Sequence, residues 1–386
     1  MQPITWNQQV VKKNNKSLVL QTVIAQEPIS RADIAQLTGL NKATVSSLIN
    51  ELLEEELVYE SGAGESSGGR RPVILHYNRV AGFSIGIDIG VNYILSVLTN
   101  LKGEILKEKS QPITDSSYSI VIGHVKQMIR SLMDSIPPSK YRIVGLAIGV
   151  PGIVDNKGTI ISAPNLGWKN INIKEEIEAE FDIPVCIENE ANAGAYGEKR
   201  FGAGQNSQNL LYISAGIGIG VGIIINGELY RGQSGFSGEI GHTIINVNGK
   251  PCRCGSKGCW EVYASENALL FMTNQEDATL ESLIQLAENN DKGTIKLFEQ
   301  IGYYLGYGIN NIINSFNPGQ VIIGNRLAMA QRWIEGPIRE TIQSCTLSFN
   351  QGNSQLHFSQ LLKYSTALGT AAFAIENFTD SLPDLC

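Results

Sequence analysis

Four potential metal ligands lie close together in one short segment of this chain. His242 is followed by Cys252, Cys254 and Cys259. One imidazole and three thiolates are one of the ligand sets that close a tetrahedral structural zinc site. Two glycines between the last two cysteines give the backbone the freedom to bring the thiolates around one ion. The segment predicts a structural zinc site; the alternative is that the cysteines are ordinary small core residues.

Two carboxylates flank these ligands. Glu239 precedes His242 by three residues, and Glu261 follows Cys259 by two. A metal would hold this loop in one shape, and the loop carries hydrogen-bond acceptors at both edges. The arrangement indicates a pocket for a polar ligand.

Length and composition indicate a soluble protein of two or three domains. The chain has 386 residues, of which 42% are hydrophobic and 17% charged, so it can bury substantial cores. It contains no apolar run near the ~18 residues of a membrane span and no signal-like N-terminus, so we expect a cytoplasmic protein without a membrane partner. Outside the metal segment, Cys186, Cys345 and Cys386 are odd in number and far apart, which argues against a disulfide framework.

The net charge of −7 is unevenly distributed. Residues 1–50 carry five basic and two acidic side chains, and residues 66–80 carry three basic and no acidic ones. Between them, residues 51–65 hold six acids and no base. This pattern predicts an acidic body with a separate DNA-contacting head.

The head has the pattern of a helix-turn-helix. A first helix ends before Pro28, Ser30 and Asp33 form a capping-box pattern for a short helix to residue 37, and Gly39 marks a turn. Asn41 then caps a helix with an apolar face of helical period and a polar face suited to the major groove. The alternative is a purely structural three-helix bundle. The predicted DNA contacts are Arg31, Asn41, Lys42, Ala43, Thr44, Ser46, Ser47, Asn50, Arg70 and Arg71.

Two short strands, predicted over residues 57–60 and 73–77, convert this motif into a winged helix. The loop between them carries Arg70 and Arg71 beside glycine and proline. Paired arginines on a flexible tip suit a narrow minor groove. The alternative is a solvated linker, and the two interpretations are compatible because such a tip can order on DNA.

The rest of the chain contains a repeated hairpin pattern. An apolar strand over residues 83–90 is followed by hairpin partners at 94–98 and 105–106, and residues 210–225 repeat the pattern around a second glycine run. The repeat predicts two similar α/β lobes with a ligand cleft between them.

Here the chain resembles the ROK family (repressors, open reading frames and kinases) over nearly its whole length. The resemblance implies a ribonuclease H-like, actin-like fold after the winged head. We expect the head at residues 1–80, lobe I at 81–198 and 367–386, and lobe II with the zinc loop at 199–366. Segments 39–47 and 62–72 look most like those of the xylose repressors of Gram-positive bacteria. The motifs that carry the resemblance are Asp88–Gly90, Pro151–Gly152, Pro164–Trp168, Glu188–Asn192, Gly216–Gly222, Glu239–His242 and Cys252–Glu261.

The resemblance also implies the sugar-binding residues. Carboxylates accept hydrogen bonds from sugar hydroxyls. His242 would place one ring nitrogen on zinc and the other on a sugar hydroxyl, with the metal setting its tautomer. The implied sugar ligands are Asn165, Asn189, Glu190, Glu239, His242 and Glu261.

Departures from the kinase pattern argue against an enzyme. Glu190 stands where ROK kinases have a catalytic aspartate, and a general base must lie within reach of its proton. Residues 91–93, Ile217 and Ile219 replace residues that hold phosphates and Mg²⁺, and phosphoryl transfer depends on such positioning. The remaining glycines would then serve only the hairpin turns.

The combined expectation is a repressor of xylose-utilisation genes that D-xylose releases from a palindromic operator. A homodimer or higher homo-oligomer would place recognition helices in successive major grooves. Two alternatives stay open: an ATP-dependent sugar kinase with a DNA-binding head, and a repressor controlled by a protein partner.

Overall fold

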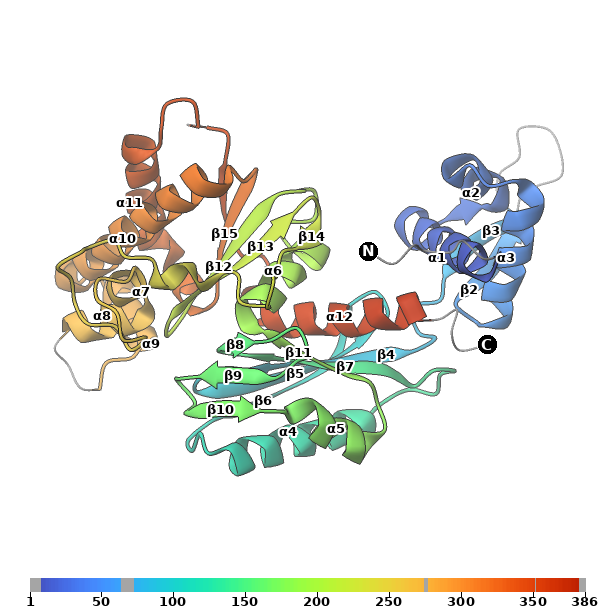
Figure 1. Cartoon of the computed structure of the whole chain (residues 1–386), viewed down its shortest axis with the longest axis horizontal. Helices are drawn as coiled ribbons and strands as arrows, with labels where there is room; N and C mark the ends of the chain where they lie inside the picture. Colours follow the sequence, from blue (N-terminus) through green and yellow to red (C-terminus); the bar gives the residue numbers. More distant parts are fainter. Residues whose placement is uncertain (1–7, 64–72, 274–276, 351, 382–386) are drawn as a thin grey trace.

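The structure is a computed structural model that describes residues 8–63, 73–273, 277–350 and 352–381. It consists of a small N-terminal head and two larger lobes (Figure 1). No helix in these described ranges is long and apolar enough to cross a membrane. Arg70 and Arg71, the predicted wing tip, and Cys386 lie outside the described residues.

The head has the predicted helix-turn-helix and two strands of a wing. Its elements are α1 (Gln8–Gln26), β1 (Ile29–Ser30), α2 (Arg31–Thr38), α3 (Lys42–Glu54), β2 (Val58–Ala63) and β3 (Val73–Tyr77). The sheet order is β1-β3-β2, so β3 lies between the other two strands. Strand β2 extends three residues further than predicted, because Glu60, Ser61 and Ala63 still pair with β3.

Local capping explains where the head helices begin. The Asp33 N–H donates to the Ser30 hydroxyl (3.2 Å), and the Ser30 N–H donates to the Asp33 carboxylate (3.3 Å), which completes the predicted capping box. Gly39 adopts a φ of 71° in the turn, where a side chain would be strained. The Asn41 side chain then accepts from the Thr44 N–H (2.8 Å) and starts α3.

Each lobe is built on one five-stranded mixed sheet. In both sheets the middle strand is antiparallel to the next strand in the chain and parallel to a later one. This shared topology confirms the duplication that the two hairpin patterns predicted. The first sheet has the order β11 (Val185–Asn189), β7 (Ile143–Val150), β4 (Phe83–Ile89), β5 (Tyr93–Asn100) and β6 (Ile105–Pro112). The second has the order β14 (Glu228–Leu229), β13 (Ile219–Ile225), β12 (Leu210–Ala215), β15 (Gln320–Gly324) and β16 (Gln355–Phe358).

Helices cover both faces of each sheet and bury the two main cores (Figure 1). The first sheet lies between α4 and α5 on one face and α12 on the other, and the second between α10 and α11 on one face and α6 on the other. These helices are α4 (Tyr118–Met133), α5 (Ile173–Phe181), α6 (Glu190–Phe201), α10 (Lys292–Phe316), α11 (Gln331–Cys345) and α12 (Ser365–Ser381). The smaller elements are β8 (Ile153–Val154), β9 (Ile160–Ala163), β10 (Trp168–Ile171), η1 (Glu239–His242), α7 (Glu261–Ala264), α8 (Glu266–Thr273), α9 (Leu280–Glu288), η2 (Arg326–Ala330) and η3 (Leu362–Tyr364).

Glycines in the strands allow helices to approach closely. A Cβ at Gly222 would overlap the Ala191 carbonyl oxygen of α6, and a Cβ at Gly86 would overlap the Ala367 carbonyl oxygen of α12. The expectation that the glycines of the second run serve only a hairpin turn is therefore wrong for Gly222, since close helix packing requires it. Helix α6 begins directly after β11 of the first sheet but packs on the second sheet. It therefore belongs to both lobes by different criteria, and the predicted lobe limits stay a prediction.

The head packs directly on lobe I and on the end of α12. Ile375 and Phe378 of α12 belong to the same buried cluster as the apolar faces of the head helices. The ring of Tyr141 meets that of Phe378 edge-on at 4.9 Å, and its hydroxyl donates to the Glu55 carbonyl (3.0 Å). The Lys140 ammonium donates to the neighbouring Glu54 carbonyl (2.6 Å). Helix α12 therefore runs from the two lobes into the core of the head.

We expect Phe378→Ala to lower the thermal unfolding midpoint and speed proteolytic release of the head. Removing a buried phenylalanine costs on the order of 3 kcal/mol, and here also removes the edge-on contact with Tyr141. Phe349→Ala is the matched control, because that ring is 72% exposed. Equal melting and equal proteolysis of the two variants would contradict this role of Phe378.

Candidate functional site

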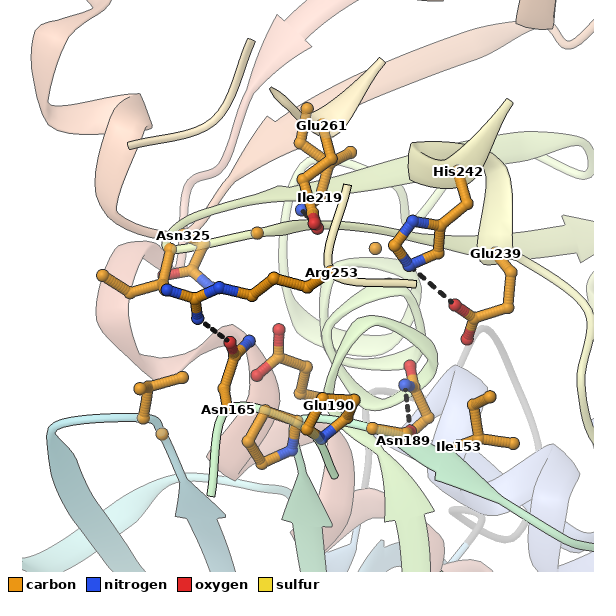
Figure 2. Close-up of a pocket in the computed structure, with 18 of the residues that line it drawn as sticks. Ile153, Asn165, Asn189, Glu190, Ile219, Glu239, His242, Arg253, Glu261 and Asn325 are labelled. Atoms are coloured by element: carbon orange, nitrogen blue, oxygen red, sulfur yellow. Dashed lines mark hydrogen bonds and ion pairs between the residues drawn. The ribbon is translucent and has the colours of Figure 1, made fainter. Parts of the chain in front are cut away.

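A cleft with a volume of about 150 Å³ opens between the lobes. Its walls come from the loop after β4, the segments after β7 and β9, the start of α6, the glycine loop before β13 and the metal segment. All six predicted sugar ligands line this one cleft, although 96 residues separate the first from the last. Figure 2 shows them converging from both lobes. They are Asn165, Asn189, Glu190, Glu239, His242 and Glu261.

Asn189 fixes the start of α6 at the edge of the cleft. Its side-chain oxygen accepts from the N–H groups of Ala191 (2.8 Å) and Asn192 (3.1 Å), as a helix cap does. Its amide nitrogen donates to the Gly152 carbonyl (2.8 Å). One amide N–H is therefore left for a ligand, and the cap directs the next side chain, Glu190, into the cleft (Figure 2).

Glu190 lines the cleft, and a second buried carboxyl group, that of Asp88, lies close enough to affect its ionisation. Asp88 is 2% exposed, and one of its oxygens accepts from the Tyr93 hydroxyl (2.7 Å), while the other has no partner among the described residues. Burial raises the pKa of Asp88 to about 7 against the opposing effect of the Tyr93 hydrogen bond. Burial, and then the charge of Asp88, raises the pKa of Glu190 to about 8, although the Ser214 hydroxyl lies 3.4 Å away.

Glu261 reaches the cleft because Gly218 has no side chain. One Glu261 oxygen accepts from the Ile219 N–H (2.9 Å). A Cβ at Gly218 would overlap that same carboxylate oxygen. The second glycine run thus holds a carboxylate at the cleft.

The four predicted metal ligands form one compact cluster. Their ligand atoms all lie within 4.8 Å of one another. The Cys254 and Cys259 sulfurs are 3.7 Å apart, and His242 Nδ1 lies 3.6 Å from the Cys252 sulfur. Metal–sulfur and metal–nitrogen bonds of ~2.3 Å and ~2.0 Å in a tetrahedron give edges of roughly 3.8 Å and 3.5 Å. The cluster therefore fits a tetrahedral metal ion.

The metal segment also orients His242 and Glu239 for the cleft. While Nδ1 of His242 faces the sulfurs, Nε2 faces the Glu239 carboxylate at 3.9 Å (Figure 2). Burial raises the pKa of Glu239, and His242 opposes the shift. One imidazole thus lies between the cysteine cluster and the cleft.

Arg253 is a cleft residue that the sequence analysis did not select. It lies between Cys252 and Cys254, and its side chain crosses the cleft (Figure 2). Its Nη1 donates to the side-chain oxygen of Asn165 (3.1 Å), which follows β9 on the opposite wall. In the sequence, only its position between two predicted metal ligands indicates that Arg253 lies near the cleft.

The loop after β4 is filled by a tyrosine. The ring of Tyr93 packs against Gly90 so closely that a Cβ there would overlap it. The Tyr93 hydroxyl is used by Asp88. This corner of the cleft therefore contains an aromatic ring at the place where the kinase pattern has small phosphate-binding residues.

The predicted DNA contacts of α3 form a polar surface opposite the buried apolar face. Asn41, Lys42, Ala43, Ser47 and Asn50 are exposed, and Thr44 and Ser46 are half-buried. Arg31 at the start of α2 donates to the Asn50 side chain (3.0 Å) and pairs with Glu60 of β2 (2.9 Å). Arg31 and Asn50 thus hold α2, α3 and the wing together in the DNA-free head.

Comparison with known families matches both parts of the chain. A ROK family model matches residues 84–377, and a MarR family model matches residues 13–71. This chain belongs to the ROK family. Its head is a MarR-type helix-turn-helix, in agreement with the fold predicted from the sequence.

Related ROK proteins include repressors and kinases. The xylose repressor of Bacillus spizizenii is 45% identical over 376 residues, which cover 97% of this chain and 98% of that protein. A solved ROK family transcriptional regulator, a homologue of the E. coli MLC protein, is 27% identical with a TM-score of 0.83 over 97% of this chain and 98% of that one. A Streptomyces griseus ROK glucokinase, solved with glucose and AMPPNP, is 28% identical with a TM-score of 0.69, and the match covers 76% of this chain and all of that one.

We expect Glu190→Gln to melt at a higher temperature than the wild type, by a margin that grows with pH. The pKa of Glu190 rises from an ordinary 4.5 to about 8 in the fold. The folded state therefore holds the proton more tightly, and stability falls as pH rises between these values, by up to ~1.4 kcal/mol per pH unit. Glutamine cannot ionise, so the difference in melting temperature between the variant and the wild type should grow from about pH 5 to pH 8. Above that range the difference should stay constant. The exposed Glu288→Gln is the control, and a constant gap for Glu190→Gln would contradict the shift.

We expect Cys254→Ser to lose bound metal and to melt at a lower temperature. The substitution removes one of four ligand atoms from a cluster that fits a tetrahedral ion, and metal binding of this kind contributes directly to folding. Cys345→Ser, an exposed cysteine outside the cluster, is the matched control. Elemental analysis that finds no metal in wild-type protein purified without chelators would refute the metal site.

Proposed function

We propose that this ROK protein is a repressor of xylose-utilisation genes that D-xylose releases from operator DNA. The observation that carries this proposal is a polar ligand cleft joined by one continuous helix, α12, to a DNA-binding head. The likeness to the Bacillus spizizenii xylose repressor over nearly the full length of both chains supports the choice of sugar.

The cleft has the chemistry that a sugar needs. Glu190, Glu239 and Glu261 can accept hydrogen bonds from neighbouring hydroxyls, and carboxylates accept two each in such sites. The Asn165 amide nitrogen, which has no partner among the described residues, and Nε2 of His242 also lie at the cleft. The proposed sugar ligands are these residues together with the remaining amide N–H of Asn189.

We propose that the metal is zinc and that its role is structural. Three cysteines and one histidine match the ligand preference of zinc in closed sites. Zinc would cross-link the loop and hold the ring of His242 in one orientation. The ring could then present Nε2 to the sugar.

Contacts between α6 and α12 provide the route from the cleft to the head. The Thr366 hydroxyl of α12 donates to the backbone carbonyl of Glu190 (3.2 Å), the first residue of α6. Three turns further on, Ile375 and Phe378 of the same helix pack in the head core. A sugar that closes the cleft would shift α12 and with it the head. Release requires xylose to bind the non-operator conformation more tightly, because equal binding would shift nothing.

The operator contacts proposed for the head are Arg31, the wing arginines Arg70 and Arg71, and the polar face of α3 from Asn41 to Asn50. The exposure of the α3 face supports the assignment. A homodimer in the cytoplasm, with two such helices, would match a palindromic operator whose half-sites lie one helical turn apart.

We further propose that the protein is not a sugar kinase, in contrast to part of its family. The Tyr93 ring fills the corner beside Gly90 and its hydroxyl binds Asp88. Glu190 has a carboxyl one methylene longer than the aspartate of the kinase pattern, and a raised pKa. The filled corner and the longer side chain support a pocket that binds sugar without transferring phosphate.

We expect D-xylose to weaken operator binding in a gel-shift or fluorescence titration, because xylose would stabilise the non-operator conformation. L-xylose, with the same composition and the opposite hand, is the control and should have no effect. Unchanged operator affinity at saturating D-xylose would contradict the assignment and favour control by a protein partner.

Coupled ADP-release assays with ATP and a sugar panel should show no turnover. Turnover that Glu190→Ala abolishes would instead establish a kinase.

A further inference from the structure

The predicted sugar ligands are rich in acceptors and poor in donors. Three of them are carboxylates, and Asn189 has committed its oxygen and one N–H to backbone groups. A sugar hydroxyl is both a donor and an acceptor, so a pocket with more acceptors than donors leaves some hydroxyl oxygens without partners. An unpartnered polar group in a closed site costs binding free energy. A further donor in the cleft would supply the missing partners.

Two arginines line the cleft, and only one of them is available as that donor. Arg326 is held away by a double hydrogen bond to the buried Glu266 (2.8 and 3.0 Å) and by Glu281 (3.0 Å). Among the residues that the structure describes, Arg253 forms no ion pair, and its one hydrogen bond is to the neutral Asn165. Its guanidinium has five N–H donors and no acceptor.

The metal segment determines where this guanidinium lies. Arg253 is flanked by Cys252 and Cys254, and the Cys252 N–H donates to the Ser256 carbonyl (2.8 Å) to close the loop. Pro251 and Lys257 pair as an antiparallel bridge at its base. The backbone at Arg253 is thus restrained on both sides, and its side chain points across the cleft above Asn165 and Glu190 (Figure 2).

We propose that Arg253 is a sugar-contacting residue that donates to xylose hydroxyl oxygens while remaining near Asn165. This assignment rests on the proposed function and adds a residue to its site. Because Arg253 extends from lobe II and Asn165 belongs to lobe I, the contact also links sugar binding to closure of the cleft. The cluster of metal ligands would then support the sugar through two side chains, His242 and Arg253.

Isothermal titration with D-xylose tests the assignment. We expect Arg253→Ala to weaken xylose binding about tenfold or more, since hydrogen bonds from charged donors are lost. Arg253→Lys keeps the charge without the planar fork and should lose less. Both variants should retain the metal content and melting temperature of the wild type. Lys257→Ala, another cation of the same loop, is the matched control and should bind xylose as the wild type does.

Monodeoxy analogues of xylose separate a direct contact from an indirect effect. Wild-type protein should lose affinity for each analogue, whereas Arg253→Ala should be insensitive to removal of the hydroxyl that Arg253 contacts. Equal sensitivity of both proteins to every analogue, wild-type affinity of Arg253→Ala, or metal loss in both Arg253 variants would overturn the assignment. Absence of xylose binding by the wild type would instead count against the proposed function itself.

Discussion

Two glycines allow α6 and α12 to pack backbone against backbone, and this contact joins all parts of the molecule. A Cβ at Gly369 would overlap the Ala193 carbonyl oxygen, and a Cβ at Gly197 would overlap that of Ser365. Helix α6 starts at the cleft and covers the second sheet, while α12 covers the first sheet and ends in the head core. Close-packed interiors transmit displacement instead of absorbing it. The two lobes and the head are therefore connected through this one packed contact.

The opposite wall of the cleft depends on the cysteine and histidine cluster. That wall has little regular structure, since the chain from Thr243 to Cys259 forms only turns and two isolated bridges. Gly258 occupies a position where a side chain would overlap the Asn246 carbonyl, so the loop is compact. One wall is thus held by helix packing, and the other is a compact loop around the cysteine and histidine cluster. His242 and Arg253 project from this loop into the cleft.

Local patterns predicted the head and the metal cluster well, because capping, turns and ligand spacing act over a few residues. Asn41 as a helix cap and the set from His242 to Cys259 needed no knowledge of distant contacts. Long-range packing decided the rest. Asn189 caps α6 and also donates to Gly152. Arg253 crosses the cleft to Asn165. Both contacts join segments that only the fold brings together. No local pattern indicates such partners.

Buried carboxyl groups at and near the cleft favour the binding of a polar ligand. Burial raises the pKa of Asp88 to about 7 and that of Glu190 to about 8, and the charge of Asp88 adds to the shift of Glu190. A hydroxyl that donates to Glu190 favours its ionised form and thus lowers its pKa. The proposed binding of a sugar near neutral pH would then be coupled to release of a proton. Glu190, whose ionised form is costly in this fold, would therefore be a group through which the proposed sugar stabilises the protein.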